Sequence, residues 1–582
     1  MKKLGILLLV LTCLTCQQKN SNNIFITQFE KSGGTETSEY SDIISYYKEL
    51  SNSYPELSVF EMGETDAGLP LHIVVFNTDG KTQLNSIKNS SKNSVLINNG
   101  IHPGESDGID ASMLLLRDIV QNDSLKKRYK NTLIVVIPIY NIGGSLNRNS
   151  NTRANQNGPK EYGFRGNTRN YDLNRDFVKQ DTKNSAAFAE IFHTIEPDVF
   201  IDNHVSNGAD YQYAISHLFT QHNKLGGALG KFIETQMRPA LESSMMQKKI
   251  PITPYVNVWG GTPKEGWSQF YDSPRYSTGY TTLFNTLGMM VETHMLKPYK
   301  IRVKQTYELL LSMLDFTEDR AADIKIVRKN AIDETLKKKT YPIIFKINPK
   351  KDPSVIQFRG YEGEMIASKV TNGKRLSYDI TKPYLEPVDY FNEYRPVKEI
   401  TIPKAYILKQ GWHRIIERLQ NNQIFYTQFE KDTTLVVETL HIEDYKTRTS
   451  AYEGHYLHYN TSVKIDSIAV HFSKGDLYIP VHQKGARYLM ETLEPEATDS
   501  FFNWNFFDSV LQQKEGYSGY VFEDVAEQIL KENATIKDAF EAKIAKDKDF
   551  EKNPRAQLNF IYKRSMHYEK AHLLLPIYKA YE

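Results

Sequence analysis

Short apolar runs alternate with longer amphipathic stretches between about residues 38 and 316. Four of these runs are almost continuously apolar and short enough to be buried strands: 94–98, 133–139, 199–202 and 289–292. Between them, residues 107–120 and 224–237 carry apolar side chains at helical spacing. Near-continuous apolar strands separated by helices predict an α/β domain with a mixed or parallel sheet.

The pattern changes after about residue 315. Short β-like pieces follow as far as about residue 480, among them 342–347, 399–403 and 434–440, and helical spacing returns in 523–533 and 536–546. We therefore predict six parts: a signal peptide (1–16), a tether (17–37), the α/β domain (38–316), a linker helix (317–340), an accessory β-rich domain (341–482) and a helical C-terminal region (483–582). The aromatic stretch 501–507 is predicted to be core, because clustered aromatic rings usually bury one another.

The first residues indicate export. Lys2 and Lys3 precede an apolar run, 4–14, that is too short to span a bilayer and is typical of a secretory signal. The segment resembles a bacterial lipoprotein signal, which implies a lipid on Cys16 and an anchored protein facing the periplasm or the cell surface. Cys13 is the alternative lipid site, and an ordinary signal peptide is the alternative interpretation.

Composition and cysteine usage narrow the chemistry. The 582 residues are 40% hydrophobic and 12% aromatic with a net charge of only +2, which fits a globular chain and gives no reason to expect a nucleic-acid partner. The chain contains 2 cysteines, and both lie in the signal. The mature protein therefore has no disulfide, no cysteine nucleophile and no cysteine metal ligand.

Histidine and carboxylate residues follow three of the predicted strands. His102 and Glu105 come just after strand 94–98, His204 follows strand 199–202, and Glu292 ends strand 289–292. Strand ends are where α/β sheets bind ligands. Two histidines and one glutamate would leave a fourth zinc position open for water, and Glu292 could then act as the base that is not a ligand.

Asn174 and Arg175 lie between these groups in the sequence. An amide beside a planar guanidinium is suited to holding a carboxylate by two hydrogen bonds. The zinc-peptidase signature His-Glu-x-x-His, in which a helix carries both histidines, is missing from the sequence.

These motifs occur in the order and rough spacing of the zinc carboxypeptidase A family, which the chain resembles over roughly residues 40–315. The resemblance implies a carboxypeptidase-like fold, in which a mixed eight-stranded sheet is flanked by helices. It also implies one zinc ion held by His102, Glu105 and His204, Glu292 as base, and Asn174 with Arg175 as the carboxylate clamp. It implies two further roles. One is an arginine for the oxyanion, for which Arg153 has the best spacing and Arg148 and Arg165 are competitors. The other is a substrate-site tyrosine, for which Tyr271 has the best spacing and Tyr276 and Tyr280 are competitors.

The expected activity is release of C-terminal residues from peptides, with Glu292 acting on zinc-bound water. Two alternatives share the metal site: cleavage of cell-wall peptides and deacylation of N-acyl amino acids. A surface lipoprotein that only binds peptides is the alternative that is not an enzyme. Arg275 would favour an acidic substrate group if it lined the side-chain pocket.

Overall fold

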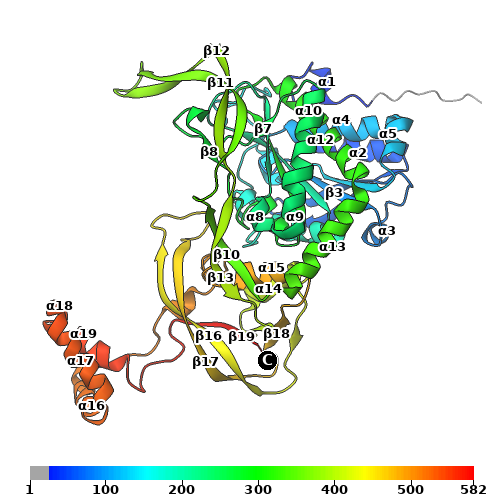
Figure 1. The fold of residues 1–582 in the computed structure, drawn as a ribbon. Coiled ribbons are helices and arrows are strands. Elements are labelled where there is room, and N and C mark those ends of the chain that lie inside the picture. Colours follow the sequence, from blue (N-terminus) through cyan, green and yellow to red (C-terminus); the bar gives the residue numbers. More distant parts are fainter. Residues whose placement is uncertain (1–24, 582) are drawn as a thin grey trace, which may run out of the picture.

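An eight-stranded mixed sheet forms the centre of the α/β domain in the computed structural model, which describes residues 25–581 (Figure 1). Its strand order is β1-β2-β4-β3-β5-β9-β6-β7. Strands β4, β3, β5 and β9 run parallel, and β2 and β6 join them antiparallel on either side. The bounds are β1 Leu57–Glu64, β2 Pro70–Phe76, β3 Asn93–Asn98, β4 Thr132–Ile137, β5 Val199–Ser206, β6 Ile215–Phe219, β7 Thr253–Pro254 and β9 Leu287–His294.

Both faces of this sheet are buried, which explains why its central strands are continuously apolar. In β3, Val95 and Ile97 pack with one hydrophobic cluster while Leu96 packs with the other, as expected for side chains that alternate across a strand. The first cluster is completed by helices α2 (Tyr40–Ser53), α4 (Asp107–Gln121), α9 (Gly227–Phe232), α10 (Arg238–Gln247) and α12 (Tyr299–Asp319), and the second by α7 (Lys183–Ile195). The predicted α/β fold, a mixed eight-stranded sheet flanked by helices, is confirmed.

One predicted helix is interrupted. The segment 224–237 is divided into α8 (His222–Leu225), α9 and a π-helical turn at Ile233–Met237. Gly226, with a φ of 71°, separates the first two, and Gly227, with a φ of 54°, begins α9. A positive φ is readily adopted by glycine and ends a right-handed helix.

The accessory region, by which we mean everything from residue 341 onward, is dominated by strands as far as residue 480, as predicted. A two-stranded sheet pairs β10 (Thr340–Ile347) with β13 (Tyr394–Thr401), and the long hairpin of β11 (Ser354–Ala367) and β12 (Lys374–Phe391) attaches to β8 (Trp267–Ser268) of the α/β domain. A six-stranded sheet follows, in the order β15-β18-β14-β19-β16-β17. Its bounds are β14 Ala405–Leu408, β15 Thr427–Gln428, β16 Thr433–Thr447, β17 His458–Phe472, β18 Leu477–Pro480 and β19 Leu574–Ala580.

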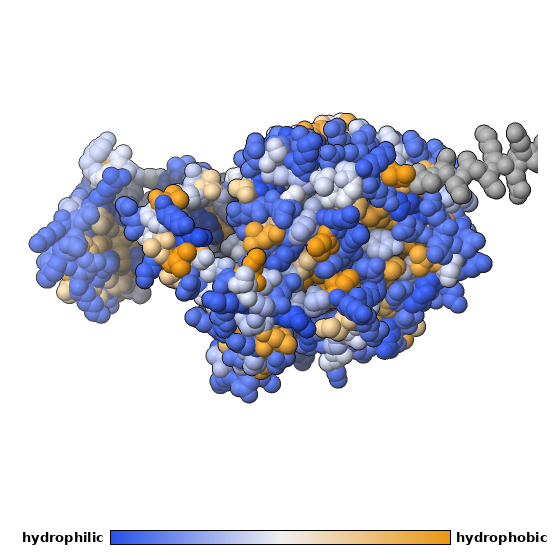
Figure 2. All heavy atoms as spheres, turned by 90° about the horizontal axis from the view of Figure 1, so that it is seen from above, coloured by the Kyte–Doolittle hydropathy of each residue, from blue (hydrophilic) through white to orange (hydrophobic). Residues whose placement is uncertain are grey.

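The predicted helical tail is only partly helical. Helices α16 (Gly519–Glu532), α17 (Ala534–Lys546), α18 (Lys548–Glu551) and α19 (Pro554–Tyr562) form a small unit with a core of its own, set apart from the main body in Figures 1 and 2. The chain then returns as β19 and pairs with both β14 and β16. A pattern of seven residues at the end of a chain does not reveal that its partners lie more than a hundred residues earlier.

Only part of the predicted N-terminal segments falls within the residues that the structure describes. The signal 1–16 and residues 17–24 of the predicted tether lie outside the described residues. Residues 25–37 are not a tether, because Phe25 and Phe29 are buried and Glu30 forms an ion pair with Arg117 at 2.6 Å. Within residues 25–581, no helix is long and apolar enough to span a bilayer. The face in Figure 2 is mainly hydrophilic, with apolar residues in small scattered groups.

The accessory region and the α/β domain share one continuous hydrophobic core. Trp504 from the aromatic stretch is fully buried within the cluster that also contains α7, as predicted for a core residue. Arg418 of α14 (His413–Asn421) donates to the carbonyls of Lys179 and Gln180 at 3.0 and 2.8 Å. Arg275 forms an ion pair with Asp499 at 2.7 Å. The two parts therefore pack as one folded unit.

We expect Trp504→Ala to lower the free energy of unfolding by about 3–5 kcal/mol, the usual cost of deleting a buried tryptophan ring. Urea denaturation followed by circular dichroism measures the change. Trp259→Ala is the matched control, since that ring is 61% exposed and its loss should cost less than about 0.5 kcal/mol. Equal stability of the two variants would contradict a shared core.

Candidate active site

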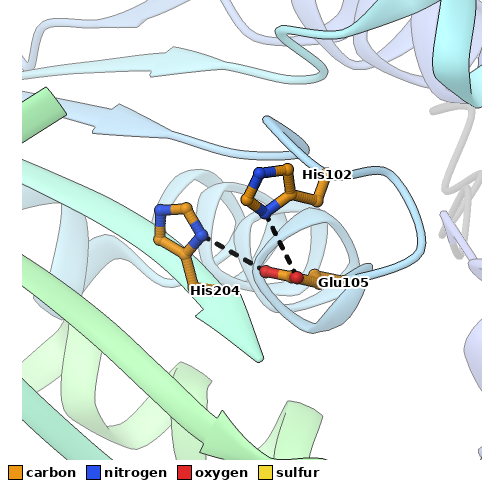
Figure 3. A group of neighbouring side chains, drawn as sticks. All are labelled: His102, Glu105 and His204. Atoms are coloured by element: carbon orange, nitrogen blue, oxygen red, sulfur yellow. Dashed lines mark hydrogen bonds and ion pairs between the residues drawn. The ribbon is translucent and has the colours of Figure 1, made fainter. Parts of the chain in front are cut away.

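Three side chains from two strand ends meet above the sheet. His102 and Glu105 lie in the loop that follows β3, and His204 lies near the end of β5. Their ligand atoms all fall within 4.8 Å of one another, and all three residues are buried (Figure 3). Because β3 and β5 are parallel neighbours, their carboxyl ends open at the same edge of the sheet, where loops can converge.

The orientation of the two imidazoles fits a zinc ion. Nδ1 of His102 and Nδ1 of His204 each lie 3.2 Å from a different oxygen of Glu105. The Nε2 atoms point away and donate to carboxylates, that of His102 to Asp172 at 2.9 Å and that of His204 to Asp202 at 2.8 Å. Metal-binding histidines typically hold their second nitrogen in this way. The donor set, two imidazole nitrogens and one carboxylate, is that of a hydrolytic zinc site with an open position.

The buried charges shift one another strongly. Burial alone would raise the pKa of Glu105, but His102 and Arg153 hold it well below its usual range. Burial alone would lower the pKa of His204, but the Asp202 carboxylate raises it well above its usual range. A cation bound between them would take the place of the imidazole protons, so metal binding should release protons.

Glu292 faces the same space from the adjacent strand. It pairs in register with His204 across β5 and β9, so both side chains project from the same face at neighbouring positions. Burial raises the pKa of Glu292 to about 8; His204 opposes this, and the Glu105 and Asp202 carboxylates add to it. A bound dication would lower this pKa, which is the direction a general base needs.

A cavity of about 500 Å³ contains this cluster. The predicted residues that line it are His102, Glu105, Arg153, Asn174, Arg175, His204 and Glu292. The structure therefore brings together every predicted site residue except Tyr271. The lining also includes Arg165, Tyr255, Trp259 and Tyr276.

Asn174 and Arg175 direct unused donors toward the cavity. The Asn174 side-chain oxygen accepts from the Ser277 amide at 3.1 Å, which leaves its NH₂ group available. Arg175 uses Nε to donate to the Tyr452 hydroxyl at 3.1 Å and Nη1 to donate to the Asn174 carbonyl at 2.8 Å. Its Nη2 makes no hydrogen bond to any of the residues described. One amide and one guanidinium donor thus remain for a carboxylate.

The structure separates the three arginine candidates. Arg153 lines the cavity and donates to Glu105 at 2.9 Å. Arg165 also lines it, but pairs with Asp172 at 2.8 Å. Arg148 is directed elsewhere, to the backbone carbonyls of residues 37, 38 and 161.

The tyrosine expectation needs correction. Tyr271 is not among the cavity residues; its ring lies 5.4 Å from that of Tyr394 in the accessory region. Tyr276, one of the competitors, does line the cavity and packs against Arg175 at 4.5 Å. Tyr280 is fully buried and donates to Asn422. Sequence spacing placed Tyr271 in the cavity, but spacing along an irregular segment does not give the direction in which its side chains point.

Arg275 also differs from expectation. Its guanidinium is committed to Asp499, and it does not line the cavity. It cannot attract an acidic substrate group there. The sequence reasoning also missed Asp202 and Tyr255. Asp202 had a usable signal, because a residue two positions before His204 on a strand shares its face; Tyr255 lies in a loop and had none.

The known proteins to which this chain is similar are carboxypeptidases. Residues 43–263 match the sequence model of the zinc carboxypeptidase (peptidase M14) family. Carboxypeptidase 2 of Trichophyton rubrum is 21% identical over 436 residues, which cover 72% of this chain and 74% of that protein. Part of the chain is therefore similar to the zinc carboxypeptidase family, and the curated relative is a carboxypeptidase of low identity.

Solved structures of similar proteins include a metallo-carboxypeptidase from Burkholderia cenocepacia, at 17% identity and a TM-score of 0.34, covering 48% of this chain and 68% of that one. Carboxypeptidase A from Helicoverpa armigera has 13% identity and a TM-score of 0.37, covering 49% and 74%. The match to the family model ends at residue 263, so Glu292 and the accessory region lie beyond it.

We expect His102→Ala to abolish stoichiometric zinc binding, because it removes one of the three candidate ligands. Metal content after dialysis, measured by mass spectrometry, is the test. His222→Ala is the control, since that histidine contacts Glu393 away from the cavity and its loss should leave zinc in place. Full zinc occupancy in His102→Ala would exclude it as a ligand.

Proposed function

We propose that this protein is an exported zinc metallocarboxypeptidase that releases single residues from the C-termini of peptides. The observation that carries the proposal is the position of the two unused donors of Asn174 and Arg175 in the same cavity as the His102–Glu105–His204 cluster. A free carboxylate held by those donors would place the last peptide bond near the cluster. An endopeptidase has no use for such a clamp.

Zinc, when bound by His102, Glu105 and His204, would polarise the scissile carbonyl and acidify a water molecule. Asp172 and Asp202 would fix the two imidazoles so that both Nδ1 atoms stay directed at the cavity. Glu292 would accept the proton of the attacking water and pass it to the leaving amine. Its carboxylate is suited to this because it makes no hydrogen bond to another described side chain.

Arg153 is the proposed oxyanion donor. Its guanidinium lies at the wall of the cavity beside Glu105, where negative charge develops on the carbonyl oxygen. A preorganised cation at that position stabilises the transition state more than the substrate. Tyr276 replaces Tyr271 as the proposed tyrosine of the substrate site, since it packs on Arg175.

The proposed substrates are peptides with a free carboxylate, and cell-wall peptides remain the second substrate class on the same site. We also retain the proposal of a lipid on Cys16 that holds the protein at a bacterial membrane facing the periplasm or the cell surface.

Glu292→Gln should lower kcat by about 10²–10⁴-fold, the usual contribution of a general base, while the zinc content stays at one per chain. Release of C-terminal residues from a mixed peptide library, followed by mass spectrometry, measures it on the chain from residue 17 onward. Glu308→Gln, a change outside the cavity, is the control. If the variant loses zinc instead, Glu292 is a ligand; if the wild type holds zinc but trims no peptide, the substrate class is wrong.

Arg153→Met should lower kcat by about 10²–10³-fold, as expected when an oxyanion donor is removed. Arg148→Met provides a matched control and should keep full activity, because within residues 25–581 Arg148 bonds only to backbone carbonyls outside the cavity. Arg165→Met tests the remaining candidate. A larger loss of kcat in Arg165→Met than in Arg153→Met would transfer the role to Arg165.

A further inference from the structure

A two-residue turn from the accessory region reaches the carboxylate clamp of the α/β domain. Tyr452 and His455 exchange backbone hydrogen bonds at 2.7 and 3.1 Å. Between them, Glu453 and Gly454 have φ of 50° and 77°. Positive φ at both central positions is the mark of a type I′ turn. The turn lies in the segment that joins β16 to β17, far beyond residue 263, where the family match ends.

Each of the four turn residues contacts the α/β domain. The Tyr452 hydroxyl accepts from Arg175 Nε at 3.1 Å, and the Glu453 carboxylate accepts from the Asp172 amide at 2.8 Å. Gly454 lies so close to Tyr171 that a side chain there would begin 2.5 Å from the Tyr171 hydroxyl oxygen. His455 bonds to Asp181 at 2.6 Å.

The backbone of the turn is held in a costly conformation. A glutamate at positive φ is disfavoured by roughly 1 kcal/mol, and such residues persist where surrounding contacts fix them. Here the contact is the Glu453–Asp172 bond, and Asp172 in turn accepts from His102 Nε2 at 2.9 Å. The strained residue therefore supports the segment that carries both the histidine partner and the clamp.

The ring of Tyr452 is itself fixed by an aromatic ring and two guanidinium groups. Its ring stacks on buried Trp504 at 6.1 Å, with 19° between the planes, and Arg448 and Arg275 lie 4.7 and 5.6 Å from it. A hydroxyl on a fixed ring occupies Arg175 Nε, while Asn174 occupies Nη1. The guanidinium is thereby fixed in one plane, with Nη2 left for the ligand.

We propose that Tyr452 is a positioning residue of the substrate-carboxylate clamp, supplied by the accessory region through the 452–455 turn. By fixing Arg175 it sets the preference for a free C-terminal carboxylate over a neutral C-terminus. The accessory region thus completes the specificity of the site. This inference rests on the proposed function for its substrate, although its test includes a binding measurement that needs no turnover.

Tyr452→Phe removes the hydroxyl and keeps the ring. Tyr445→Phe is the matched control: Tyr445 lies on β16, packs against Phe502 and donates its hydroxyl to none of the residues that the structure describes. Binding is measured by calorimetry on the zinc-loaded chain carrying Glu292→Gln, so that ligand is not consumed. The probes are hippuryl dipeptides ending in phenylalanine, leucine, lysine or glutamate, each as the free acid and as the C-terminal amide.

Tyr452→Phe should weaken binding of the acids by about three- to tenfold, somewhat below the loss of a direct hydrogen bond to a charged group, and leave the amides unchanged. With Glu292 intact, KM should rise by a similar factor while kcat changes less. Zinc content and Tm should match those of Tyr445→Phe. An unchanged acid-to-amide ratio would overturn the proposal, as would a parent protein that does not distinguish acids from amides.

Failure of the proposed function gives a different result. If the protein prefers the acids, loses that preference in Tyr452→Phe and yet releases no C-terminal residue, the clamp stands and the peptidase activity does not. If the protein trims peptides and Tyr452→Phe trims them with unchanged KM, the peptidase stands and the role of Tyr452 does not.

Discussion

Buried charge at the carboxyl ends of β3, β5 and β9 is the constraint on which the rest of the structure depends. A carboxylate out of water costs several kcal/mol unless it is paired. Asp202 is paired with His204, Asp172 with His102, and Glu105 with both histidines and Arg153. Glu292 alone lacks such a partner among the described side chains, and its raised pKa is the consequence. The same absence leaves its carboxylate available for chemistry.

This charge balance explains why the accessory region is part of the site. Asp172 caps the three-residue 3-10 helix Leu173–Arg175, and so short an element between loops holds charged groups loosely by itself. The turn at 452–455 bonds to both residues, and Trp504 buries the back of that turn. The precision that the proposed site requires is therefore obtained from a hydrophobic core that the α/β domain and the accessory region share. The contacts that stabilise the fold and the contacts that position Asp172 and Arg175 therefore belong to the same core.

Sequence patterns predicted the parts of the fold that depend on residues close together in the chain. Continuous apolar runs predicted β3, β4, β5 and β9, and the residues at their ends predicted the cluster of His102, Glu105, His204 and Glu292. The patterns failed where partners are distant. β19 inserts between strands more than a hundred residues earlier, Tyr271 turns toward the accessory region, and Tyr452 meets Arg175 across 277 positions. No periodicity along the chain encodes those contacts.

The side chains that line the cavity differ in how rigidly the fold holds them. His204 and Glu292 project from adjacent strands of the rigid sheet, so their separation is fixed by strand spacing. The groups that would meet the variable part of a substrate, Tyr255 and Trp259, lie on loops. Asn174 and Arg175 are intermediate: they lie on a short 3-10 helix that the accessory region contacts. Changes in those loops would therefore alter side-chain preference without moving His204 or Glu292, whereas a change at the 452–455 turn would alter the preference that we propose for a free carboxylate.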